Sequence, residues 1–353
     1  MTAHIARRRA ELAARLAGRR AIYLDLRYWV IIREVRAGLR TSAEDRKLVH
    51  HLEAVVTQDR AFCPITDATF MELMKIGNPD WRMATARLVD EFSCGVSLIP
   101  EEERIAEEAD AFMRTAIVQR TPGLKPSPWT SLSYVLGPLH PTGMTRLGEA
   151  DQLAVQKAFF DYLWTLPLAE MAGALNFENF EDLSDFQAAA DQVNAGNAAH
   201  AGQMTSFEAV LEQEFQGMAE LCAPFVDAAV LSLMPLASTP SAERRKYWCN
   251  AIRLSLQNPE HARRLPTAHV QAVLHALLRW EFRQKKIEPN DFFDYMHGAA
   301  ALGYCCAYLG EKGLAGALRH QRLKLAEIHD CYVTNRVSEA GEFVRKLRRP
   351  RVA

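Results

Sequence analysis

Short apolar runs alternate with amphipathic helical patterns at both ends of the chain, and this alternation constrains the fold more than any other feature. Apolar runs stand at 21–26, 61–65 and 95–99 near the N-terminus, and at 304–309 and 328–333 near the C-terminus. Short buried strands that alternate with helices are typical of a parallel sheet covered on both faces. The sequence therefore predicts one α/β domain with a parallel sheet to which both chain ends contribute.

Capping residues and periodicity place helices between these runs. Ser42 opens a helix that extends to about Gln58, Thr66 caps a helix over 67–76, and a further helix starts at about Pro79. The expected C-terminal helices are 289–303, with Asn290 as its cap, 311–320 and 338–347.

No convincing strand is found between Glu101 and about Lys286. Residues 121–142 are rich in Pro and Gly and predict a long loop. Helical patterns dominate the rest of this region, at 147–172, 180–193, 207–236, 243–256 and 267–286. We expect a basic N-terminal helix at 1–18, a first α/β part at 19–100, a mostly helical insertion at 101–286, and a second α/β part with a basic tail at 287–353.

Charge is segregated along the chain, although the formal net charge is only −1. Residues 158–243 contain thirteen Asp or Glu and no Lys or Arg, whereas 244–288 contain ten Lys or Arg and three Glu. Solvated helix faces are the simplest interpretation of any one block. Together the blocks suggest phosphate contacts for the basic segments, and for the acidic stretch 158–243 either exclusion of non-specific polyanions or binding of a protein partner.

Several classes of protein are disfavoured by what the sequence lacks. Its seven cysteines include no C-x-x-C pair, which argues against a disulfide framework or a zinc ribbon and predicts reduced thiols in the cytoplasm. No apolar run approaches the length of a membrane span, so no membrane partner is expected. The phosphate-binding motifs G-x-x-x-x-G-K-[ST] and G-x-G-x-x-G are also absent.

Five acidic residues stand where ligand-binding carboxylates are expected. Asp25 lies in the first apolar run, and open α/β sheets bind ligands at the carboxyl ends of their strands. Glu72 lies on the helix after the second run, Asp291 and Asp294 share one face of a later helix, and Glu311 follows the run before the last. Taken singly, each has a simpler interpretation as a helix cap or a surface residue.

The motifs around these acids are YLDLRYW at 23–29, PITDATFMELMK at 64–75, NDFFDYMH at 290–297 and YC at 304–305. In this order they resemble the PIN-like nuclease superfamily, and in particular a larger bacterial PIN-like family. The resemblance covers the two α/β parts and leaves the helical middle outside it.

The resemblance implies a nuclease that hydrolyses phosphodiester bonds of RNA, or of single-stranded DNA, with Mg²⁺ or Mn²⁺. The implied catalytic and metal-binding residues are Asp25, Glu72, Asp294 and Glu311, with Asp291 as an outer or alternate ligand. The chemistry of the residues agrees, because hard divalent cations prefer carboxylate oxygens and can activate water for attack on a phosphodiester.

Basic residues near the implied site are candidates for phosphate contacts. They are Arg27, Arg279, Arg283, Lys285 and Lys286. A basic helix face with Trp280 packed inward explains the last four about as well. For His297, packing on a helix face is preferred over contact with a phosphate.

One departure from the family pattern leaves an alternative open. The family commonly has Tyr-Cys-Asp where this chain has Tyr304-Cys305-Cys306, and a neutral thiol is a poor ligand for Mg²⁺. A catalytically degenerate PIN-like module that binds nucleic acid or protein without cutting is therefore the second hypothesis. A helical interaction scaffold, in which the acids are only caps, is the third.

Overall fold

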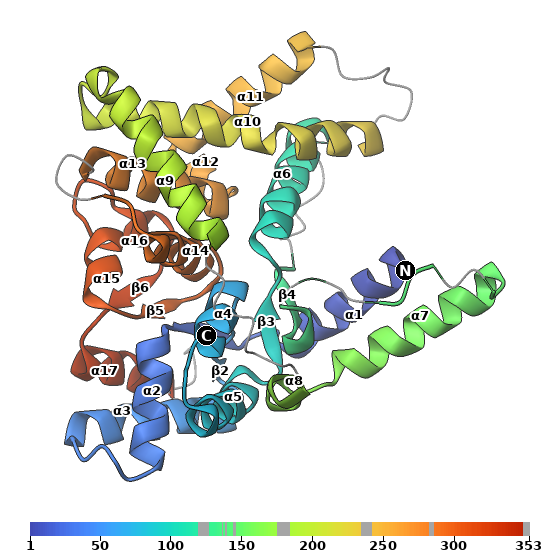
Figure 1. The fold of residues 1–353 in the computed structure, drawn as a ribbon, viewed down its shortest axis with the longest axis vertical. Helices are drawn as coiled ribbons and strands as arrows, with labels where there is room; N and C mark the ends of the chain where they lie inside the picture. Colours follow the sequence, from blue (N-terminus) through green and yellow to red (C-terminus); the bar gives the residue numbers. More distant parts are fainter. Residues whose placement is uncertain are drawn as a thin grey trace.

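The fold was determined as a computed structural model, which describes residues 1–118, 127–135, 137, 140–143, 146–174, 184–233, 242–281 and 286–348. Strands and helices alternate at both ends of the chain, and the middle is mostly helical (Figure 1). Within these described residues, no helix has both the length and the apolar character needed to cross a membrane.

The N-terminal part supplies a first helix and three strands. Side-chain caps explain where its helices begin, because Ser42, Thr66 and Asn78 accept hydrogen bonds from backbone amides in the first turns that follow them. The elements are α1 (Thr2–Arg15), β1 (Arg20–Leu24), α2 (Leu26–Arg36), α3 (Ala43–Thr57), β2 (Ala61–Phe62), α4 (Asp67–Met74), α5 (Pro79–Ser93) and β3 (Val96–Leu98).

The C-terminal part supplies two more strands. The sequence predicts Asn290 as the cap of its first helix, but the N-cap residue is Glu288. Asp291 Oδ2 accepts a hydrogen bond from the Glu288 amide at 2.8 Å, which is part of a capping box. The elements are α14 (Pro289–Tyr304), β5 (Ala307–Leu309), α15 (Lys312–Leu318), α16 (Leu325–Ile328), β6 (Tyr332–Thr334) and α17 (Val337–Leu347).

Four parallel strands form the central sheet in the order β2-β1-β5-β6. A single parallel bridge between Ile65 and Ser97 places β3 beside the chain that follows β2. The predicted parallel sheet, flanked by helices and contributed by both chain ends, is confirmed. After β1, the chain first adds β2 on one side of that strand and later adds β5 on its other side, so the direction in which strands are added reverses at β1. Ligands of such sheets bind at the carboxyl ends of the strands where this reversal occurs.

The middle of the chain contains a strand that the sequence did not predict. β4 (Trp129–Ser131) pairs antiparallel with β3, within the expected loop 121–142. Its three residues are too few to show a period of two. The other elements are α6 (Glu101–Val118), η1 (Leu132–Tyr134), α7 (Glu149–Trp164), α8 (Leu168–Ala174), α9 (Ser184–Ala199), η3 (Ala201–Gln203), α10 (Phe207–Leu233), α11 (Ala242–Gln257), α12 (Pro259–Ala262) and α13 (Pro266–Glu281).

One predicted helix of the middle region is divided in two. The pattern at 147–172 forms α7 and α8, and Pro167 stands between them. Proline disfavours the helical conformation of the residue before it, which explains the break at this position.

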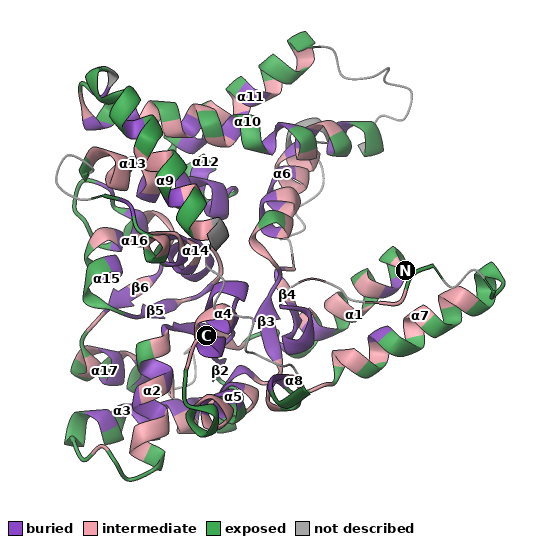
Figure 2. Ribbon diagram, viewed as in Figure 1, coloured by how far each residue is buried: buried purple, intermediate pink, exposed green. Residues whose placement is uncertain are grey.

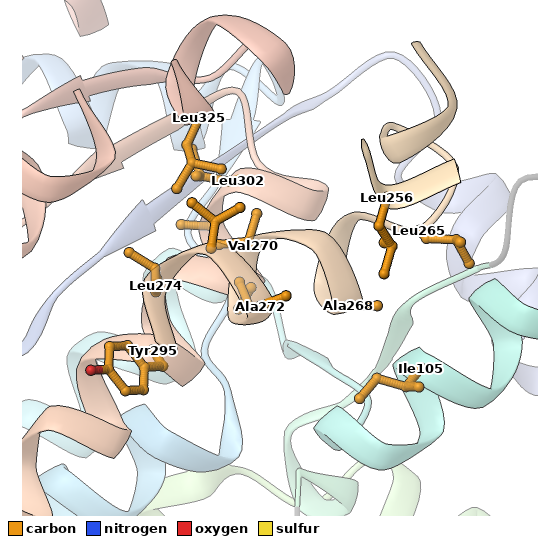
Figure 3. Close-up of a cluster of buried hydrophobic side chains, with 14 of the residues drawn as sticks. Ile105, Leu256, Leu265, Ala268, Val270, Ala272, Leu274, Tyr295, Leu302 and Leu325 are labelled. Carbon is orange, nitrogen blue, oxygen red and sulfur yellow. The ribbon is translucent and has the colours of Figure 1, made fainter. Parts of the chain in front are cut away.

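Helix α13 connects the helical middle to the sheet. It packs against α10 on one side and α14 on the other. The approach to α14 is close, since a Cβ on Gly298 would lie 2.8 Å from Leu274 Cδ1. Val270 of α13 lies beside Leu302 of α14 at this junction, and Leu274 belongs to the same buried cluster (Figure 3). The buried surface therefore runs without interruption from the sheet into the middle helices (Figure 2).

Some of the segregated charges pair with each other at the surface of the molecule. Arg245 and Arg253 of α11 form ion pairs with Asp227 and Glu212 of α10, and α10 and α11 lie side by side (Figure 1). In the N-terminal block, Arg9 lies 2.6 Å from Glu107 of α6. Some residues of the acidic and basic stretches thus pair with each other, and Arg9 pairs within the N-terminal part.

Candidate functional site

Asp25 lies directly after β1, at the carboxyl end of a central strand, and it is buried. Its Oδ1 accepts a hydrogen bond from the Arg27 amide at 3.3 Å, which caps α2. Its Oδ2 accepts hydrogen bonds from the Tyr308 hydroxyl at 3.0 Å and from the Glu311 amide at 3.1 Å. The capping role considered for this residue is therefore real. The same contacts fix the carboxylate between β1 and β5, at the reversal of the strand order.

Glu72 approaches this edge from α4. Its Oε2 lies 3.1 Å from Nε2 of His297, and the contact has the distance of an ion pair without the alignment of a full hydrogen bond. Burial by itself would lower the pKa of His297, but the close contact with Glu72 and the negative charge of that residue outweigh burial and raise the pKa above its ordinary value. Asp25 and Asp294 add to the increase.

Asp294 stands one helical turn before His297 on α14. Its side chain reaches solvent, yet the protein around it removes enough water from the carboxylate to raise its pKa to about 6. His297 opposes this increase, and the negative charges of Asp25, Asp291 and Glu72 add to it. Asp294 is therefore a carboxylate surrounded by like charges.

Glu311 is the N-cap residue of α15, and its carboxylate is exposed. Partial burial raises its pKa, the charge of Asp25 raises it further, and Arg27 opposes both. Glu72 also contributes to the increase. The charges of Asp25 and Glu72 therefore reach both Asp294 and Glu311. The structure thus gathers four sequence-predicted carboxylates at one edge of the sheet.

Asp291, the fifth predicted acid, has a local role. It caps its own helix through the Glu288 amide, and its charge reaches Asp294. Its role as an outer or alternate ligand stays a prediction.

The predicted phosphate-contacting residues separate into three groups. Arg27 is exposed beside the carboxylates, where its Nη1 donates to the Asn335 carbonyl at 3.3 Å, and Lys286 is also exposed. Arg279 is instead used within the protein, where it pairs with Glu214 and Asn197, so we remove it from the candidate site. Arg283 and Lys285 lie outside the described residues.

Three residues of the site have contacts that the sequence did not predict. Tyr23 and Tyr308 are paired in register on neighbouring strands, and His297 contacts both Tyr23 and Glu72. For His297 the preferred interpretation was packing, and the structure adds polar contacts at both of its ring nitrogens. The sequence offers one signal for the two tyrosines, which is a hydroxyl group within an otherwise apolar strand. Such a buried hydroxyl needs a hydrogen-bonding partner.

Cys306, where the resemblance would place an acid, lies away from the carboxylates. Its amide donates to the Ala21 carbonyl at 2.8 Å, and it stands before β5, near Arg20 at the start of β1. Asp25 follows the opposite end of β1. A thiol at position 306 therefore does not take a carboxylate away from the edge that holds Asp25.

The carboxylates fit a divalent cation by their chemistry and by their crowding. They offer hard oxygen donors, and their mutual repulsion is what a cation would relieve. In the described residues, however, no three His, Cys, Asp or Glu side chains are grouped closely enough to coordinate an ion as they stand. Binding would thus require these side chains to move closer together.

Comparisons of the chain with models of protein families, with curated proteins and with solved structures give no match.

Proposed function

We propose that this chain is a metal-dependent endonuclease of the PIN-like type, which hydrolyses phosphodiester bonds of RNA. Single-stranded DNA is the alternative substrate. The observation that carries the proposal is the gathering of Asp25, Glu72, Asp294 and Glu311 at the strand-order reversal of a parallel sheet. Carboxylates brought together from such distant parts of the sequence are costly to fold, because they repel one another.

In this proposal, Asp25, Glu72 and Asp294 hold Mg²⁺ or Mn²⁺, and Glu311 is a further ligand. The cation supplies the activation of water and the stabilisation of the leaving oxygen. Asp25 is held ready by the donors from Tyr308 and Glu311, so little reorganisation of that carboxylate is needed. Exposed Arg27, beside Asp25, binds a phosphate of the substrate.

Cleavage of labelled single-stranded RNA, hairpin RNA and single-stranded DNA tests the proposal. The wild-type protein is compared with the Asp25→Asn/Asp294→Asn variant in Mn²⁺, Mg²⁺ or EDTA. Asp330→Asn serves as the matched control, because Asp330 lies near Cys306, at the other end of the strands. We expect cleavage by the wild type and the control, and none with EDTA or with the double variant.

Two other results would contradict the proposal. Cleavage that survives in the double variant would exclude these carboxylates as the catalytic group. Binding of RNA without cleavage in any metal would favour the non-catalytic PIN-like module.

A further inference from the structure

The imidazole of His297 connects two parts of the site. It is buried, on the face of α14 that also carries Asp294 one turn earlier. Its Nδ1 lies 2.6 Å from the hydroxyl of Tyr23, and its Nε2 lies 3.1 Å from Oε2 of Glu72. Its Nδ1 is therefore hydrogen-bonded to β1, and its Nε2 lies at ion-pair distance from α4.

Tyr23 gives the imidazole a rigid anchor. Its side chain is fully buried in the central strand, and its hydroxyl also lies 2.9 Å from Thr66 Oγ1 and 3.0 Å from Thr69 Oγ1. Thr66 caps α4, the helix that carries Glu72. The same small network therefore fixes the start of this helix and the imidazole that meets its glutamate.

The contact with His297 restricts the orientation of the Glu72 side chain. A glutamate at a partly exposed position keeps several rotamers, and fixing them costs conformational entropy. The contact with His297 involves Oε2 and leaves Oε1 for another partner. Side chains that ligate metals are commonly oriented in this way by hydrogen-bonding neighbours, which do not touch the metal themselves.

We propose that His297 is a positioning residue that holds the Glu72 carboxylate in the carboxylate group, from an anchor on Tyr23. This inference deepens the proposed nuclease function and rests on it. His297 acts through Glu72 and contacts neither the cation nor the substrate.

Two amide substitutions separate positioning from packing. In His297→Gln the terminal amide reaches about as far as Nε2, so it keeps a donor for Glu72. In His297→Asn the shorter amide reaches about as far as Nδ1, so it keeps the contact with Tyr23 and loses the one with Glu72. A packing role would favour neither amide for metal binding, whereas positioning requires Gln to be the better substitute.

The experiment is a titration of the full chain with Mn²⁺, followed by calorimetry. We expect His297→Asn to weaken Mn²⁺ binding about 10- to 100-fold, the range for loss of an outer-shell partner. We expect His297→Gln to stay within about threefold of wild type on the same argument. Tyr23→Phe removes only the anchoring hydroxyl and should also weaken binding, while Asp330→Asn should not. Equal affinities for the Asn and Gln variants would overturn the proposal.

A second measurement keeps the positioning role separate from the nuclease proposal. If the wild-type protein binds no Mn²⁺, the metal site fails, but the contact between Glu72 and His297 remains measurable by urea unfolding of Glu72→Gln, His297→Asn and the double variant. A double variant less destabilised than the sum of the single variants supports the positioning role. Additive effects would overturn it, and Tyr23→Phe replaces His297→Asn in the cycle if the Asn variant does not fold.

Discussion

The ring of Tyr308 occupies the space that a side chain on Gly310 would need. A Cβ built on Gly310 would lie 2.0 Å from Cζ of Tyr308 and 2.1 Å from its hydroxyl oxygen. This hydroxyl is the one that donates to Asp25. The glycine after β5 therefore allows a neighbouring strand to hold the carboxylate at the end of β1.

Gly310→Ala is expected to displace the Tyr308 ring and release Asp25. Forcing an additional methyl group into a packed site costs about 1–3 kcal/mol of the free energy of unfolding. Loss of the Tyr308 donor should also lower metal-dependent cleavage, because Asp25 is then less well oriented. Urea unfolding and the RNA cleavage assay measure the two effects.

Gly316→Ala is the control for this substitution. Gly316 is exposed within α15, and a methyl group added there would meet nothing within 4 Å, so alanine should raise stability by up to about 1 kcal/mol. Equal effects of the two substitutions would refute the close contact at Gly310.

Asp294→Asn is expected to stabilise the metal-free protein at neutral pH. The folded-state pKa of Asp294 is raised from 3.8 to about 6, so the folded protein binds more protons than the unfolded chain between these values. Stability therefore falls as the pH rises through this window, and the full cost of ionisation is present above about pH 6. Asparagine carries no charge and avoids that cost.

Thermal unfolding in EDTA at pH 7.5 and at pH 4 or below tests this prediction. We expect the variant to melt above the wild type at the higher pH and to lose that advantage at the lower one. An advantage that did not change with pH would show that the cost of ionising Asp294 is not its cause.

Arg27 and Arg279 are expected to differ in what they contribute. Arg27→Ala should weaken RNA binding. It should also lower the slope of the logarithm of the binding constant against the logarithm of the salt concentration by about 1 in magnitude, because one phosphate contact is lost. Arg279→Ala should leave that dependence unchanged and lower stability by about 1–3 kcal/mol, because Glu214 and Asn197 lose a charged hydrogen-bonding partner. Binding titrations at several salt concentrations and urea unfolding make the comparison, and a reduced salt slope for Arg279→Ala would return this residue to the interface.

Glu108→Ala is expected to loosen the junction between α6 and α13. The buried Glu108 carboxylate accepts hydrogen bonds from the Thr267 amide at 3.0 Å and from the Tyr304 hydroxyl. Donors left unpaired in the interior cost about 1–3 kcal/mol each. Glu108→Gln keeps one acceptor oxygen and should cost less, as urea unfolding would show. Equal losses for the two variants would mean that these hydrogen bonds do not stabilise the junction.

Features set by neighbouring residues could be predicted from the sequence. The helix starts after Ser42 and Thr66 depend on contacts within one turn, so a local motif is enough to identify them. Ends of elements were less certain, since Asp25 belongs to a helix cap and not to the strand run 21–26. The predicted helices 180–193 and 267–286 include residues 180–183 and 282–285, which lie outside the described residues.

The candidate acids could be chosen from the sequence because each follows a predicted strand or lies on a neighbouring helix. Their supporting partners could not be chosen in this way. The contact between Tyr23 and His297 joins residues 274 positions apart, and that between Tyr308 and Asp25 joins residues 283 apart. No periodicity or local motif encodes such pairs, which depend on how the two chain ends meet in the sheet.

The sheet order has a consequence for the synthesis of this protein. β1 pairs with β5, which is made only after the whole helical middle has been translated. Until then, one edge of β1 has no partner, and exposed strand edges favour aggregation. A chaperone that covers this edge would therefore act most usefully before β5 has been made.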